Sequence, residues 1–151
     1  MSQSPAVAPI FHPALTTLST EENDFRLAVR EFAEGEIKPL VSKMDQESKM
    51  DPGLVKKLFE MGMMGIETPE AFGGTGSTFT SACLAIEEIG RIDGSVSVLM
   101  DVQNTLVTNA VLKWGTDAQK ENYLPKLATE WVGSYALSES SSGSDAFALK
   151  L

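Results

Sequence analysis

Near the end of the chain, the run from Ala136 to Asp145 contains the residues best suited to binding chemistry. Its sequence is ALSESSSGSD. Ser138 offers a hydroxyl, and the small residues around it would let a flat ligand approach the backbone. Hydroxyls together with free backbone amides can bind the edge of a heteroaromatic ring or a diphosphate. On composition alone an ordinary serine-rich turn is the favoured interpretation, because serine clusters are common in loops.

Other groups could also carry chemistry, and for each we favour a structural role. Residues 73–78, GGTGST, lack the lysine of a Walker phosphate loop and follow no predicted strand, so we interpret them as a helix connector. His12 has no evident partner and is expected in solvent. Cys83 falls on an apolar helical face, which predicts a small buried side chain rather than a nucleophile. Glu87 and Glu88 would point about 100° apart on a helix, which favours a solvated face over a shared proton.

Composition limits the classes of function. The chain has 151 residues, 42% hydrophobic and 22% charged, which is typical of one globular domain. Its net charge of −9 argues against nucleic acid or an anionic membrane as the main partner. No apolar run is long enough to predict a membrane span. With one cysteine and one histidine, neither a disulfide framework nor a His/Cys zinc site is expected.

The chain divides into a leader and a helical region. Residues 1–18 contain three prolines and no lysine or arginine, so they predict a flexible leader without the features of a secretory or mitochondrial targeting sequence. From there to residue 130, apolar residues recur at helical spacing. Side chains that can begin a helix stand at Ser19, Asp51, Asp93 and Thr116. The sequence therefore predicts a helical domain over residues 19–130.

The pattern changes at Trp131. Over residues 131–138, side chains of one kind recur at every second position. A period of two is typical of a strand. A chain that stops at Leu151, soon after its first strand, leaves the edges of that strand without a local partner. We therefore expect an all-α fold class with one terminal strand, residues 131–151 being the start of a truncated β domain.

Three segments resemble the acyl-CoA dehydrogenase family. YALSESSSGSDAFALK, residues 135–150, fits every fixed position of the family signature: small, aliphatic, Ser or Thr, Glu, two variable, small, Gly, Ser, Asp. MGMMGIETPEAFGGTGST, residues 61–78, resembles the family's glycine-rich connector, and residues 101–139 resemble its central helix, its Gln-Lys…Leu-Pro motif and its strand. The resemblance runs from about Ser19 to Leu151. VSKMDQESKM, MGIE and SDAFALK are most similar to the short/branched-chain members.

The resemblance implies a fold and a cofactor. Members have an N-terminal helical domain, a middle β domain and a C-terminal helical bundle, and FAD binds between the last two domains and a partner subunit of a homotetramer. By position, the residues implied to bind FAD are Tyr135, Ala136, Leu137, Ser138, Glu139, Gly143 and Ser144. Ser138 is expected to hydrogen-bond near the reactive nitrogen. Ser144 is also expected to touch the CoA part of the substrate, and Gln103 to approach its acyl chain.

The implied reaction is the α,β-dehydrogenation of an acyl-CoA thioester in the mitochondrial matrix, with electrons passed from the flavin to an electron-transfer flavoprotein. The family's catalytic glutamate lies in the C-terminal domain, so we expect no catalytic base here and do not assign that role to Glu139. Our first hypothesis is an N-terminal fragment, inactive alone, of a short/branched-chain acyl-CoA dehydrogenase. The alternative is a non-enzymatic helical interaction module, which would pair with full-length subunits through its exposed final strand, or a regulatory short isoform.

Overall fold

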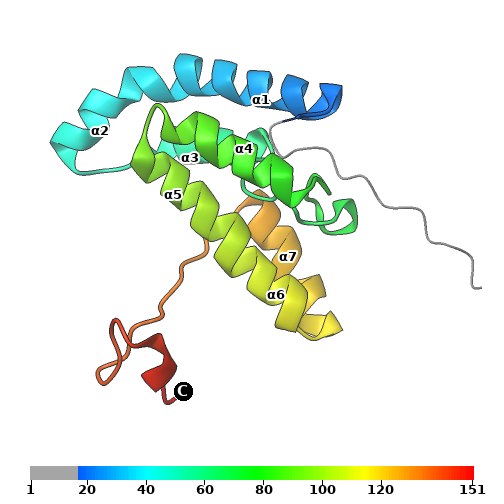
Figure 1. Cartoon of the computed structure of the whole chain (residues 1–151), viewed down its shortest axis with the longest axis vertical. Helices are drawn as coiled ribbons and strands as arrows, with labels where there is room; N and C mark the ends of the chain where they lie inside the picture. Colours follow the sequence, from blue (N-terminus) through cyan, green and yellow to red (C-terminus); the bar gives the residue numbers. More distant parts are fainter. Residues whose placement is uncertain (1–16) are drawn as a thin grey trace, which may run out of the picture.

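The computed structural model describes residues 17–151, and this part is mainly helical (Figure 1). The α-helices are α1 (Thr20–Phe32), α2 (Val41–Glu47), α3 (Pro52–Glu60), α4 (Phe79–Gly90), α5 (Gly94–Asp101), α6 (Asn109–Trp114) and α7 (Asp117–Thr129). The shorter segments are the π-helices η1 (Ala33–Ile37) and η4 (Val102–Thr108) and the 3-10 turns η2 (Lys38–Leu40), η3 (Glu70–Phe72) and η5 (Ala146–Ala148). The predicted helical class is confirmed. His12 and nearly all of the predicted leader lie outside the described residues.

The helix starts follow from local sequence. The four predicted starting residues each cap a helix: Ser19, Asp51, Asp93 and Thr116. Ser19 accepts a hydrogen bond from the amide of Glu22 at 3.1 Å, and the Glu22 carboxylate accepts one from the amide of Ser19 at 2.8 Å. Thr116 and Gln119 form the same reciprocal box at the start of α7. Each box satisfies two amides that have no partner within the helix.

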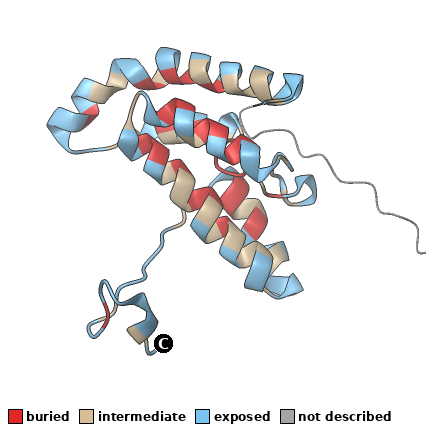
Figure 2. Cartoon of the chain, viewed as in Figure 1, coloured by how far each residue is buried: buried red, intermediate tan, exposed pale blue. Residues whose placement is uncertain are grey.

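The helices α1 to α5 contribute to one hydrophobic core. The long α1 lies across α4, and α4 packs on α5; η4 and α6 continue α5, and α7 packs against α3 and α6 (Figure 1). Buried positions gather on the facing sides of these helices (Figure 2). The largest of the fully buried apolar side chains are Val29, Ile37, Leu54, Leu58, Met64, Ile66, Ile89, Val96, Met100 and Leu124.

Glu88 is buried, so the predicted solvated face is wrong at this residue. Its side chain is 2% exposed, and Arg30 on α1 donates to its two oxygens at 2.8 and 2.7 Å. Arg91 adds a hydrogen bond at 2.9 Å. The bonds from Arg30, with those from Arg91, hold the pKa of Glu88 below its ordinary value although burial opposes this. A bidentate ion pair therefore joins α1 to α4.

Cys83 is exposed, and the predicted buried position is wrong as well. The buried face of α4 passes through Ala82, Ala85 and Ile89. Cys83 follows Ala82 directly, and one helical step of about 100° turns its side chain away from that face. The apolar character of Cys83 therefore did not predict on which side of the helix its side chain lies.

The predicted terminal strand is absent from residues 131–138, which have an irregular extended path. In the tail, the structure contains one isolated bridge, between Glu139 and Ser142. A strand needs a neighbouring extended backbone to pair with. Within residues 17–151, the remaining segments are helices and the loops that join them, so such a neighbour is lacking.

Asn104, on η4, fastens the loop between α3 and α4. Its side chain is buried and accepts a hydrogen bond from the amide of Ile66 at 2.8 Å. Its amide group donates to the carbonyls of Met63 and Met100 at 2.8 and 2.9 Å. All three bonds of the carboxamide go to buried backbone groups, so the path of the loop depends on this side chain.

We predict that Glu88→Gln lowers the free energy of unfolding by about 2 kcal/mol at pH 7, because the charged hydrogen bonds are weakened. The unfolded carboxyl has a pKa of about 4.3 and the folded one lies lower, so the stabilisation is present above that pH. It is lost as the pH falls through the folded pKa, and the difference between the proteins should then shrink. Urea denaturation at several pH values measures this. Glu87→Gln, an exposed neighbour, is the control; a difference independent of pH contradicts the prediction.

A second prediction concerns Asn104→Leu. This change removes three hydrogen bonds and leaves the buried amide of Ile66 and carbonyl of Met63 without a partner, so we expect a loss of about 3 kcal/mol. Denaturant unfolding followed by circular dichroism measures it. Asn122→Leu, at an exposed position of α7, should change stability by less than about 0.5 kcal/mol. Equal effects of the two substitutions would refute a fastening role.

Candidate functional site

The signature segment, residues 135–144, leaves the helical body after α7 and lies apart from it in Figure 1. Its first half is open. Tyr135 is 52% exposed and Leu137 is 40% exposed. The backbone groups of residues 135–138 make no hydrogen bond with any other residue of the described range. These donors and acceptors are therefore available to a ligand or to another polypeptide.

The second half of the segment is a closed turn. The amides of Glu139 and Ser142 each donate to the other residue's carbonyl, at 3.0 and 3.1 Å. The buried Ser142 hydroxyl donates to the carbonyl of Asp145 at 2.6 Å. The carboxylate of Glu139 accepts from the amides of Lys150 and Leu151 at 3.0 and 3.1 Å. Glu139 therefore holds the backbone of the turn.

Gly143 and Ser144 are exposed and follow directly after the bridge that closes this turn. A Cβ added to Gly143 would meet nothing within 4 Å. The described chain therefore gives no steric reason for glycine here, and the backbone is open to close approach from outside.

Gln103 lies elsewhere, buried in η4. Its amide group donates to the carbonyls of Leu127 and Trp131 at 2.7 and 2.9 Å. Its oxygen accepts from the amide of Gly133 at 2.7 Å. The structure thus gives this side chain three backbone partners at the end of α7 and beyond it. Its contact with an acyl chain stays a prediction.

A shallow hollow of about 640 Å³ brings Tyr135 against α6. Leu106 and the strongly exposed Trp114 form its apolar part, and Asn109 supplies an amide. Of the predicted site residues, Tyr135 alone lines this hollow. The arrangement provides a partly aromatic wall beside the start of the signature segment.

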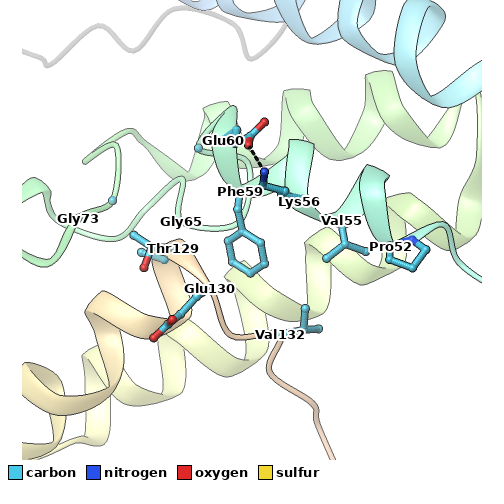
Figure 3. Close-up of a pocket in the computed structure, with 13 residues that line it drawn as sticks. Pro52, Val55, Lys56, Phe59, Glu60, Gly65, Gly73, Thr129, Glu130 and Val132 are labelled. Atoms are coloured by element: carbon cyan, nitrogen blue, oxygen red, sulfur yellow. Dashed lines mark ion pairs between the residues drawn. The ribbon is translucent and has the colours of Figure 1, made fainter.

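A second cavity, of about 520 Å³, lies between α3, the following loop and the end of α7. Figure 3 shows the Phe59 ring pointing into it, with Val55 and Val132 nearby and the Lys56–Glu60 ion pair at its rim. None of the predicted site residues lines this cavity.

The glycine-rich loop is a structural connector, as its sequence predicts. Gly73 and Gly76 have φ values of 82° and 61°, which favour glycine. The amides of Thr75 and Gly76 donate to the carbonyls of Gly65 and Thr68. Because these amides already have partners inside the chain, they cannot cradle a phosphate.

Residues 17–151 contain no group of three His, Cys, Asp or Glu side chains placed to hold a metal ion. Within the same range, each helix is too short or too polar to cross a bilayer.

The sequence and the fold both have known relatives. The family model for the acyl-CoA dehydrogenase N-terminal domain matches residues 19–130. Over 149 residues the chain is 46% identical to the mitochondrial short/branched chain specific acyl-CoA dehydrogenase of Bos taurus, a match that covers 99% of this chain and 33% of that protein. The chain thus spans about a third of the length of this curated relative.

Solved structures agree with this. Butyryl-CoA dehydrogenase from Megasphaera elsdenii matches with a TM-score of 0.79 and 30% identity, covering 86% of this chain and 35% of that one. A glutaryl-CoA dehydrogenase from Mycobacterium smegmatis, in complex with FADH2, matches with a TM-score of 0.81 and 26% identity, covering 88% and 34%. On the family match over residues 19–130, supported by these likenesses, the chain belongs to the acyl-CoA dehydrogenase family.

Proposed function

We propose that this chain is the N-terminal portion of an FAD-dependent acyl-CoA dehydrogenase of the short/branched-chain type. The reaction is the α,β-dehydrogenation of a short or branched acyl-CoA thioester, with electrons passed to an electron-transfer flavoprotein. The whole enzyme is a homotetramer of the mitochondrial matrix. The family of the chain and the identity of its bovine relative support this assignment.

The observation that carries the proposal is the open backbone of residues 135–138. The amides and carbonyls of this segment have no partner among the described residues, so they can pair with a cofactor. The hydroxyl of Ser138 stands on the same exposed stretch. Donors and acceptors in this arrangement match the polar edge of a flavin ring.

The residues present therefore fit FAD. Tyr135, Leu137 and Ser138 would lie along the ring, and Gly143 and Ser144 would allow close approach of the backbone to the rest of the cofactor. When bound, FAD supplies the acceptor for the hydride that leaves the acyl β carbon. The chain's own residues bind and orient the ring.

Glu139 is not the base that removes the α proton. Its carboxylate already accepts two backbone hydrogen bonds at the end of the tail. We assign no catalytic residue among residues 17–151, and the base comes from a part of the enzyme outside this range. The chain alone is therefore inactive.

A second candidate, a non-enzymatic interaction module, is favoured by exposed apolar side chains on α5, η4 and α6. Val98 is 59% exposed and Trp114 is 76% exposed, with Leu106 between them. Co-purification with a complete acyl-CoA dehydrogenase subunit, without any gain of flavin, would favour this module over the enzyme.

We predict that the 151-residue chain alone binds FAD weakly or not at all, because the open segment 135–138 covers only part of such a cofactor and lies exposed in the described part of the chain. Titration of the purified chain with FAD, followed by flavin fluorescence, measures this. Tight stoichiometric binding would overturn the assignment as a portion of a larger flavin site.

A chimera tests the function itself. The aligned part of the chain replaces the matching third of the bovine relative, and the product should bind flavin and oxidise 2-methylbutyryl-CoA. Ser138→Ala in this chimera removes one hydrogen bond to the flavin, so its flavin affinity should fall about tenfold, equivalent to about 1.4 kcal/mol. Ser140→Ala, at an exposed variable position of the signature, should not change it. A folded chimera without flavin contradicts the proposal.

A further inference from the structure

Several contacts hold the tail where it leaves the helical body after α7. The proposed function by itself does not predict these contacts. We define this exit clamp as Gln103 and Val107 on η4, Lys126 on α7, and Trp131 and Gly133 just after α7. Gln103 is 0% exposed, and its three hydrogen bonds use both N–H groups and the oxygen of its carboxamide. The two acceptors and one donor around it fix the orientation of the amide.

The partners of Gln103 bracket the point where helix becomes tail. Leu127 is in the last turn of α7, so its carbonyl has no partner further along that helix. The carbonyl of Trp131 and the amide of Gly133 stand on either side of residue 132. One side chain therefore ends the helix and also directs the backbone that follows it.

Two further contacts hold the same point. A Cβ at Gly133 would lie 2.5 Å from Cγ1 of Val107, so only glycine fits against η4 here. The ammonium of Lys126 lies 4.6 Å from the centre of the Trp131 ring, and the amide of Trp131 donates to the carbonyl of Lys126 at 2.7 Å. These contacts come from η4 and α7 and hold two residues of the tail, Trp131 and Gly133.

The position of the backbone at Gly133 influences where residues 135–138 lie relative to a bound ligand. Consecutive Cα atoms are about 3.8 Å apart, so a slip of the backbone by one residue would move Tyr135, Leu137 and Ser138 away from their places at the ring and put their neighbours there. Four residues separate Gly133 from Ser138, so the backbone held at Gly133 keeps Ser138 within about 17 Å of that point.

We propose that Gln103 is a positioning residue, which fixes the register of residues 135–138 for the flavin ring by holding the backbone at Trp131 and Gly133. The proposal rests on the proposed function. In this role Gln103 acts on the flavin through the backbone of the tail, and not through contact with the acyl group of the substrate.

The test compares Gln103→Met with Asn104→Leu. Each substitution replaces a buried carboxamide of η4 by an apolar side chain, but Asn104 bonds to the α3–α4 loop and to α5, not to the tail. Gly133→Ala disturbs the same exit against Val107 and leaves the Gln103 amide in place. Gln46→Met, at an exposed position of α2, is the control for the substitution itself.

The first readout uses the 151-residue chain. In Gln103→Met, amide exchange of residues 131–138 should become at least tenfold faster than in Asn104→Leu. With Trp114→Phe as background, Trp131 is the only tryptophan, and its emission should move toward that of a solvated ring in Gln103→Met and Gly133→Ala only. If Asn104→Leu changes the tail as much as Gln103→Met does, or if Gln103→Met leaves exchange unchanged, the exit clamp is refuted.

The second readout uses the chimera with the bovine relative. Gln103→Met and Gly133→Ala should weaken flavin binding at least tenfold and alter the absorption spectrum of the flavin that remains, whereas folded Asn104→Leu should do neither. Faster exchange in the tail with unchanged flavin binding and spectrum overturns the positioning role. A wild-type chimera that folds without flavin refutes the proposed function instead, and the exchange measurements then still decide whether Gln103 holds the exit.

Discussion

Two neighbouring side-chain carboxamides are buried in η4, and their hydrogen bonds determine the path of two other parts of the chain. Asn104 holds the loop between α3 and α4, and Gln103 holds the chain where it leaves α7. A buried amide without partners is costly, so each side chain and its backbone partners constrain one another. The π-helical segment thus links the loop between α3 and α4 on one side to the backbone just before the signature segment on the other. π segments of this kind occur frequently at functional sites.

Around η4 the helical domain is a rigid frame with one open extension. Capping boxes fix the starts of α1 and α7, and the Arg30–Glu88 pair joins α1 to α4. The signature segment, in contrast, leaves its first residues without backbone partners in the described range. Binding groups on a loop that a rigid scaffold positions are a common arrangement in proteins. The division of the chain into frame and open segment is what the proposed flavin site requires.

The sequence predicts what depends on near neighbours and fails where distant residues decide. Helix starts at Ser19 and Thr116 follow from residues three positions apart, and the glycine connector follows from its composition. The burial of Glu88 depends on Arg30, 58 residues earlier, and the orientation of Gln103 on Leu127, 24 residues later. Neither pairing has a local signal in the sequence. The prediction of a strand over residues 131–138 was wrong because no neighbouring strand is present among the described residues. The flavin-binding assignment of residues 135–144 came from resemblance to a family signature, not from periodicity.

We infer that the helical domain presents residues 135–138 to a flavin in a fixed register. A crystal structure of the flavin-loaded chimera with the bovine relative is the decisive measurement. We expect the flavin ring to lie against Tyr135, Leu137 and Ser138, with Gln103 still bonded to the backbone of Trp131 and Gly133. A flavin bound out of contact with these three residues, or a Gln103 side chain that has left the tail to contact the ligand, would contradict it.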